Sequence, residues 1–180
     1  MTARGARWMM DTTAEGIVVI IRDRTVFQLL AWNFWLDEDT RDSIRLVVSE
    51  LVTNAIVHGR SPYRAPIIEI GIIARRGEVY IEVSDPSDEM PVVRPVDDER
   101  EGGRGLLLVE CMALKWGAER LPHGGKRVWT LLRIPPRPSA LRRHRPDREA
   151  RQRHRAQLQA QLYANWPLTP IDSRPLAMAT

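Results

Sequence analysis

The stretch that decides the fold of this chain is Ser49-Glu50-Leu51-Val52-Thr53-Asn54-Ala55-Ile56-Val57-His58-Gly59. Glu50, Asn54 and His58 follow one another at helical spacing, so a helix would place them on one face and turn the apolar residues between them to a core. A carboxylate beside a carboxamide suits a magnesium ion and a hydroxyl or water that is to be activated. The same spacing also fits a solvated polar stripe, so the stretch alone leaves both interpretations open.

Three later segments carry chemistry of a related kind. A strand-like run ends in Asp85-Pro86-Ser87, a glycine-rich loop at 102–106 opens an apolar segment, and Gly124-Gly125-Lys126 precedes a final strand-like run. Glycines let a backbone approach phosphates closely, and a helix N-terminus attracts anions. Each segment by itself also fits an ordinary turn or hairpin connection. Together, and in this order, the four segments predict a nucleotide cradle.

This order of segments resembles that of the GHKL (Bergerat-fold) ATPases. Residues 49–59 match the N box of that family, residues 83–91 resemble its G1 box, residues 103–109 resemble its G2 box, and residues 116–117 with 124–129 resemble its closing segment. The resemblance is strongest to the small anti-sigma-factor serine/threonine kinases and their actinobacterial ATP-binding relatives. It covers residues 15–134, which is most of the chain.

The resemblance implies ATP and Mg²⁺ as ligands and gives the matched residues their roles. Glu50 is the expected catalytic residue, which would orient or deprotonate the attacking hydroxyl. Asn54 is the expected magnesium ligand. Asp85 would accept a hydrogen bond from the adenine amino group, which selects against guanine. The residues expected to contact the nucleotide are Asn54, His58, Asp85, Gly103, Arg104, Gly105, Leu106 and Thr130. For His58 a plain helix end, and for Thr130 an ordinary strand residue, stay open as alternatives.

Two departures from the family pattern bear on the activity. Asp85 is followed by Pro86 and Ser87 in place of the glycines of a typical G1 box. Lys126 and Arg127 stand where the sporulation-type kinases carry small hydroxyl residues. Nucleotide binding is therefore better supported than phosphoryl transfer. The segment 23–35 ahead of the N-box helix contains no histidine, so a complete histidine kinase is not expected.

The hydrophobic periodicity predicts a two-layer α+β sandwich, in which a mixed, mostly antiparallel sheet carries helices on one face. The resemblance implies the same arrangement, with the long loop at 86–104 acting as a lid. The expected strands are 16–21, 67–74, 78–84, 115–120 and 127–134, and the expected helices are 23–35, 40–58 and 105–114. Strands 67–74 and 78–84 flank Arg75-Arg76-Gly77 and are expected to form a hairpin.

The charge of the chain is unevenly distributed. Eight arginines and two acidic residues lie between Pro135 and Ala160, so this segment alone exceeds the net charge of +4 of the whole chain. We expect an N-terminal tail at 1–14, one ATP-binding domain at 15–134, a Pro/Arg-rich linker at 135–146, and a basic helical and then disordered tail at 147–180. Leu158, Leu162 and Trp166 fall on one side of the expected tail helix. The arginines suit a solvated surface, an acidic partner or a nucleic acid.

The expected localisation is cytoplasmic, without a membrane partner. Cys111 is the only cysteine, which excludes an intrachain disulfide and favours a reducing compartment. We expect Cys111 to be a small buried residue. No apolar run reaches the length of a membrane span, and no signal-peptide pattern precedes Asp11.

Three functions compete at this point. The leading one is an ATP-binding regulator that binds a sigma factor and phosphorylates an anti-sigma antagonist on Ser or Thr, which would make the chain a serine/threonine protein kinase. The second is a partner-switching module that binds ATP without kinase activity. The third is a nucleic-acid-binding regulator that uses the Arg-rich tail. A homodimer is left open in all three.

Overall fold

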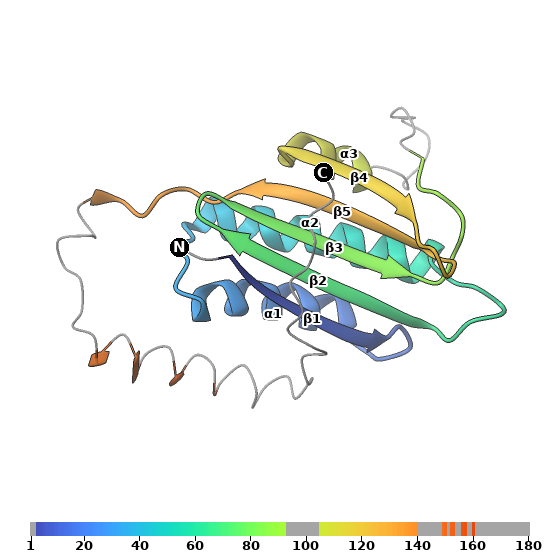
Figure 1. The fold of residues 1–180 in the computed structure, drawn as a ribbon, viewed down its shortest axis with the longest axis horizontal. Helices are drawn as coiled ribbons and strands as arrows, with labels where there is room; N and C mark the ends of the chain where they lie inside the picture. Colours follow the sequence, from blue (N-terminus) through green and yellow to red (C-terminus); the bar gives the residue numbers. More distant parts are fainter. Residues whose placement is uncertain are drawn as a thin grey trace.

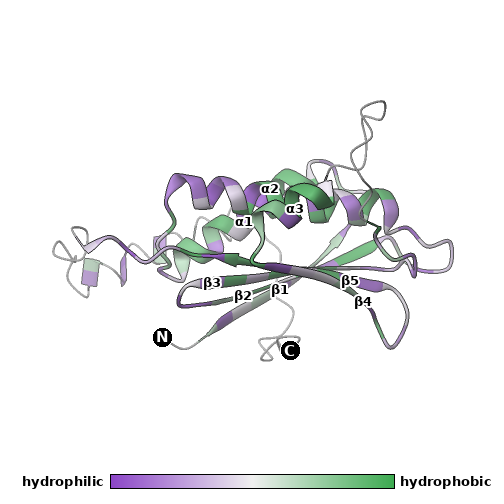
Figure 2. Ribbon diagram, turned by 90° about the horizontal axis from the view of Figure 1, so that it is seen from above, coloured by the Kyte–Doolittle hydropathy of each residue, from purple (hydrophilic) through white to green (hydrophobic). Residues whose placement is uncertain are grey.

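In the computed structural model, residues 3–92 and 105–139 are described, together with isolated positions between 149 and 160. The described strands form one sheet with the order β1-β2-β3-β5-β4 (Figure 1). They are β1 (Arg4–Asp11), β2 (Ile67–Arg75), β3 (Glu78–Asp85), β4 (Lys115–Arg120) and β5 (Lys126–Arg133). The helices α1 (Ile17–Ala31), α2 (Glu38–His58) and α3 (Gly105–Met112) lie together on one face of this sheet, as Figure 2 shows from above.

The predicted α+β sandwich with helices on one face is confirmed. The predicted hairpin is β2–β3, which turns at Gly77 with a positive φ of 92°. The predicted helix at 40–58 is α2, whose N-terminus is capped by the Asp37 side chain through a bond from the Thr40 amide. Every neighbouring pair of described strands is antiparallel. The sheet was expected to be mixed and mostly antiparallel, and its described part is antiparallel throughout.

The N-terminal third of the domain differs from the prediction. Residues 16–21 were expected to form a strand, but Ile17 begins α1. Ile17 and Ile21 are four residues apart and both buried, so one helical face places both in the core. This packing overrides the strand preference of the β-branched run. α1 ends at Ala31 and not at Trp35 because Asn33 takes a positive φ of 67°.

The segment expected to be an N-terminal tail contains a strand. β1 pairs along its whole length with β2, from Arg4 opposite Ala74 to Asp11 opposite Ile67. Trp8 points into the core and is 1% exposed, and the guanidinium of Arg24 lies 4.9 Å from its ring centroid. Ala6, Trp8 and Met10 recur with a period of two, which favours a strand, although the exposed Met9 between them is also apolar.

The core lies between the sheet and the helices. Ile70 and Ile72 of β2 and Ile81 of β3 are fully buried, as are Ile44 and Val48 of α2. Burying one such side chain stabilises the fold by about 1.5–3 kcal/mol. This packing fixes the rotation of α2 about its axis, so that Glu50 and Asn54 come to the edge of the buried face, where both are partly exposed.

The other face of the sheet carries a charged and aromatic network. Glu82 is 2% exposed and lies between Arg7, whose Nη2 is 3.0 Å from it, and Arg127, whose Nε is 3.2 Å from it. Tyr80 stacks on Trp129 with ring centroids 5.7 Å apart. Burial, followed by the nearby charge of Glu82, raises the pKa of the Tyr80 hydroxyl. Because strand residues alternate between faces, this network is separate from the helix-covered side.

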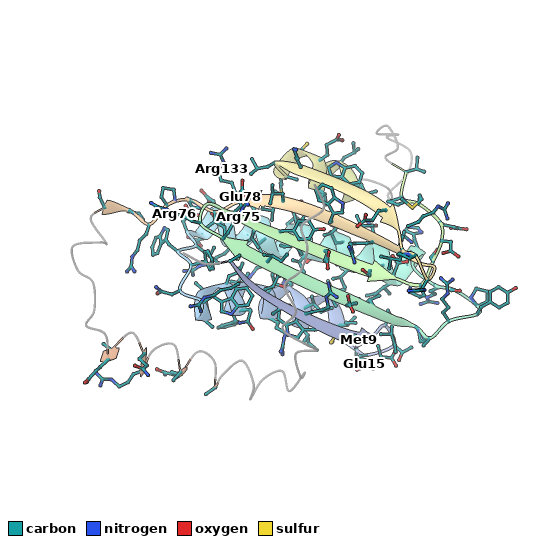
Figure 3. The ribbon with its side chains drawn as sticks, in the orientation of Figure 1. Met9, Glu15, Arg75, Arg76, Glu78 and Arg133 are labelled. Atoms are coloured by element: carbon teal, nitrogen blue, oxygen red, sulfur yellow. The ribbon has the colours of Figure 1, made fainter. Side chains whose placement is uncertain are left out.

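The two ends of the sheet differ in character. Figure 3 shows Arg75, Arg76, Glu78 and Arg133 together where β2 turns into β3 and β5 ends. Arg75 and Glu78 form an ion pair there, with Nε 2.8 Å from Oε2. Asp85 terminates β3 at the opposite end. Asp85, which was predicted to contact the base, therefore lies at the opposite end of β3 from this arginine cluster.

Some expectations fall on residues that are not described. Residues 93–104 of the expected lid at 86–104 lie outside the described residues, as do Leu158, Leu162 and Trp166 of the tail. Positions described between 149 and 160 are helical. Cys111 was expected to be buried but is exposed on α3, because Leu106 and Val109 take the inward side of this short helix. None of the described helices is long and apolar enough to cross a membrane.

Candidate functional site

The first part of the site is the edge of α2 that carries Glu50 and Asn54. The adjacent side of α2 is buried through Val47, Leu51 and Ala55. This packing fixes the helix on the core and so fixes the positions from which Glu50 and Asn54 project. Since they are one helical turn apart, their heads lie on the same side of α2. The helix thus presents a carboxylate and an amide side by side, as the sequence predicted.

Gly105, the first residue of α3, closes this part of the site. A Cβ atom on Gly105 would collide with Glu50 Oε2 and would lie 3.2 Å from Glu50 Cδ and 3.8 Å from Asn54 Nδ2. The backbone at the start of α3 therefore comes within contact of both polar side chains, and any residue larger than glycine would require the Glu50 carboxylate to move. The structure brings together the N-box pair and the glycine of the predicted G2 loop.

The second part of the site is the end of β3. The Asp85 carboxylate is buried, and its Oδ1 accepts hydrogen bonds from the Ser87 amide at 3.0 Å and from Lys126 Nζ at 2.9 Å. Burial raises the pKa of Asp85, and the bonds and charge of Lys126 and the Ser87 amide act against that rise. Pro86 and Ser87, which replace the usual glycines, thus form a tight turn that bonds back to the carboxylate.

Lys126 reaches this position from the first residue of β5. Its side chain is 4% exposed, and its Nζ also lies 3.4 Å from the His58 carbonyl oxygen at the C-terminus of α2. A cation at the C-terminus of a helix interacts favourably with the helix dipole. The ammonium group consequently ties together α2, β3 and β5. The sequence marked Lys126 only as a departure from the family pattern and missed its contact with Asp85.

Two glycines let these three elements meet. A Cβ on Gly59 would lie 2.7 Å from both Cβ and Cγ of Asp85, and a Cβ on Gly125 would collide with the Asp85 carbonyl oxygen. Gly125 also has a positive φ of 85°, which side chains other than glycine rarely adopt. The His58-Gly59 and Gly124-Gly125 pairs in the sequence are the local signal of this close packing.

A third cluster forms the rim next to Asp85, and the sequence did not predict it. Arg64 donates to the Pro86 carbonyl at 2.8 Å and lies 3.4 Å from Asp88 Oδ1. Asp88 in turn accepts from the Gly125 amide at 2.6 Å. That amide bond, and then the charge of Arg64, lower the pKa of Asp88. Arg64 and Asp88 lie in irregular segments, where hydrophobic periodicity carries no signal.

The remaining predicted residues are placed less closely around the site. Leu106 is buried on α3 beside Gly105. The His58 side chain is exposed, and only its carbonyl contacts Lys126. Thr130 is buried within β5, with its hydroxyl 3.5 Å from the Lys115 carbonyl. It lies four residues along the strand from Lys126, or about 13 Å at the rise of a β-strand. Gly103 and Arg104 lie outside the described residues.

The residues at α2 fit a bound magnesium ion with few protein ligands. Asn54 Nδ2 is buried without a hydrogen-bond partner among the described residues, so no described acceptor fixes the amide nitrogen, and the amide oxygen is a hard ligand of the kind that magnesium binds. Within the described ranges no group of three or more His, Cys, Asp or Glu side chains could hold a metal. Magnesium at a nucleotide needs no such group, since phosphates and waters supply most of its ligands.

Comparison with known proteins agrees with this geometry. A family model described as the histidine kinase-like ATPase domain matches residues 23–129. The matched span begins in α1 and ends in β5, and it contains Glu50, Asn54, Asp85, Gly105 and Lys126. The search of curated proteins gave no match.

Proposed function

The chain belongs to the histidine kinase-like ATPase domain family, and from this premise we propose that it is an ATP-dependent regulator that phosphorylates a Ser or Thr of an antagonist protein and binds a sigma factor. A domain of this family implies ATP binding. The sigma factor, the antagonist and the transfer of phosphate belong to the proposal, and the resemblance to anti-sigma-factor kinases supports them. The proposed setting is the cytoplasm.

The position of Asp85 supports adenine recognition. An ionised carboxylate can only accept hydrogen bonds, so it matches the amino group of adenine and repels the carbonyl oxygen that guanine carries at the same place. Asp85 is buried at the end of β3, where competing water is excluded. The rim of Arg64 and Asp88 holds the Gly124-Gly125 turn against it.

The approach of Gly105 to Glu50 and Asn54 is the observation that carries the proposal. In this arrangement the backbone at the start of α3 would face the phosphates, and Asn54 would hold Mg²⁺ through its amide oxygen. When bound, Mg²⁺ neutralises phosphate charge. Gly103 and Arg104, which precede α3 in the sequence, are also proposed to contact the nucleotide, as are Leu106 of α3, His58 of α2 and Thr130 of β5.

Glu50 is the proposed catalytic residue. It would accept the proton of the antagonist's Ser or Thr hydroxyl while the hydroxyl oxygen bonds to the γ-phosphorus of ATP. The bond from the γ-phosphorus to the oxygen that bridges to the β-phosphate breaks, and ADP leaves with that oxygen. The partly exposed position of Glu50 supports this role, because an incoming protein must reach it.

Glu50→Ala tests the proposal. The variant should retain ATP binding and lose transfer of radiolabelled phosphate to partners recovered by pull-down from the native cytosol, because the carboxylate acts on the incoming hydroxyl. Glu38→Ala is the matched control, since Glu38 is exposed in the first turn of the same helix. If the wild-type chain transfers phosphate to no recovered partner, ATP is a structural ligand and the chain is a partner-switching module.

A further inference from the structure

The nucleotide-base end of the site contains a buried ion pair in which the proposed function gives Asp85 a role but Lys126 none. Asp85 and Lys126 have side chains that are 1% and 4% exposed, with Oδ1 and Nζ 2.9 Å apart. Burying two charges costs free energy unless further bonds satisfy them. Here the Ser87 amide and the His58 carbonyl supply such bonds. The pair is thus a built feature of the fold rather than a surface contact.

The two donors to Asp85 use the same oxygen. The Ser87 amide and Lys126 Nζ both bond to Oδ1, and no residue in the described ranges is found to donate to Oδ2. Within the described residues the carboxylate is therefore held from one side, by Oδ1, and Oδ2 can accept a further donor. A carboxylate oxygen of this kind can accept the amino group of a purine.

We propose that Lys126 is a positioning and specificity-determining residue for the nucleotide base: it holds Asp85 by Oδ1, in the ionised form, and leaves Oδ2 to accept the adenine amino group. This inference rests on the proposed role of Asp85. In the ionised form Asp85 repels the guanine carbonyl oxygen, whereas a protonated Asp85 could donate a hydrogen bond to that oxygen. Lys126 thereby favours adenine over guanine without contacting either base.

The charges around Asp85 make Lys126 the decisive group. Lys126 comes from β5 and His58 from the end of α2, where the backbone carbonyl makes the contact. Arg64 and Asp88 lie on the rim, and they bond to each other, to the Pro86 carbonyl and to the Gly125 amide. Burial raises the pKa of Asp85, and among the described residues Lys126 is the charged side chain that lowers it.

The direction of the pH effect follows from this balance. Without the ammonium group, burial acts on Asp85 with less opposition, so its pKa rises further. In a variant without Lys126, adenine binding that needs ionised Asp85 is therefore lost at a higher pH than in the wild type when the solution is acidified. In the wild-type protein the same loss lies at a lower pH, because Lys126 keeps the carboxylate ionised.

Calorimetric titration with Mg-ADP and Mg-GDP between pH 6 and pH 8 tests the inference, since diphosphates bind without turnover. Lys126→Met should bind ADP more weakly than wild type by about tenfold to a hundredfold at pH 6, the loss expected for one charge-assisted hydrogen bond. The difference from wild type should shrink toward pH 8. Its preference for ADP over GDP should fall as well.

Two further variants serve as controls. Lys115→Met removes the only other lysine of the chain, which is exposed at the start of β4, and it should bind ADP as the wild type does. Because the ADP phosphates titrate equally in all measurements, a difference between Lys126→Met and Lys115→Met reports on the protein alone. The double variant Asp85→Asn with Lys126→Met removes both charges of the pair, so that no unpaired charge is left buried. Adding Lys126→Met to Asp85→Asn should change neither ADP affinity nor its pH dependence, because the carboxylate is gone.

The outcomes separate the inference from the proposed function. A wild-type chain that binds neither ADP nor ATP refutes the nucleotide site itself. A wild-type chain that binds ADP, with a Lys126→Met variant of unchanged affinity, pH profile and base preference, refutes the inference alone. A loss in Lys126→Met that persists equally in the Asp85→Asn background also overturns it, because Lys126 would then act on something other than Asp85.

Discussion

Replacing Gly105 with alanine separates the chemistry of the site from its stability. The added Cβ would collide with Glu50 Oε2 but would lie 3.8 Å from Asn54 Nδ2, an ordinary contact distance. The Glu50 carboxylate is the free end of a flexible side chain, so it should move aside while the backbone stays in place. We therefore expect Gly105→Ala to displace Glu50 and to leave Asn54 where it is.

The magnitude follows from this displacement. A shift of about 1 Å in a positioned catalytic group costs on the order of a hundredfold in rate, so phosphotransfer to the antagonist should fall by that factor. ATP affinity should change by no more than a few-fold. Alanine is the better helix former by at most about 1 kcal/mol, so the melting temperature should stay constant or rise by a few degrees.

Three measurements on one protein preparation check this prediction: radiolabel transfer, calorimetry with Mg-ATP, and thermal melting followed by circular dichroism. The control is Gly105→Ala placed in the Glu50→Ala background. There it should change neither ATP affinity nor any transfer rate that Glu50→Ala retains, because no carboxylate remains to be displaced. An undiminished transfer rate in Gly105→Ala would refute the reasoning, as would a further loss of rate in the double variant.

The remaining predictions concern the Arg-rich tail. Truncation after Pro138 should leave the melting temperature and ATP affinity unchanged, because β5 completes the described sheet at Arg133; a melting point lower by several degrees would instead mean that the tail packs on the domain. Full-length protein should bind an anionic partner with an affinity that falls steeply between about 50 and 200 mM salt, as counterion release requires. Titration of labelled duplex DNA and of an acidic peptide checks this, and salt-independent binding would contradict it.

The elements that the sequence predicted correctly have strong local signals. The β2–β3 hairpin alternates apolar and polar residues around Arg75-Arg76-Gly77, and α2 has an Asp37 cap and a long helical period. The Glu50–Asn54 pair was predictable for the same reason, because one helix fixes the spacing of both residues. Gly105 was predictable as a close approach, although only the fold shows that it approaches Glu50.

The features that the sequence missed depend on distant contacts. The run beginning at Ile17 has the β-branched composition of a strand, and it is helical because α2 and the sheet receive Ile17 and Ile21 on one face. The Asp85–Lys126 pair joins residues that lie 41 positions apart in the chain. It exists because antiparallel pairing sets Asp85 opposite Lys126. That register is a property of the whole sheet, and no local pattern contains it.

The central claim is that Asp85 and Asn54 bind the two ends of an ATP molecule, the base and the metal-bound phosphates. Calorimetry with Mg-ATP on Asp85→Asn, Asn54→Ala and the exposed control Asp39→Asn tests it most directly. Each site variant should lose about 1.5–3 kcal/mol of binding free energy, or roughly tenfold to a hundredfold in affinity, while the control matches wild type. Undiminished binding in both site variants would contradict the account.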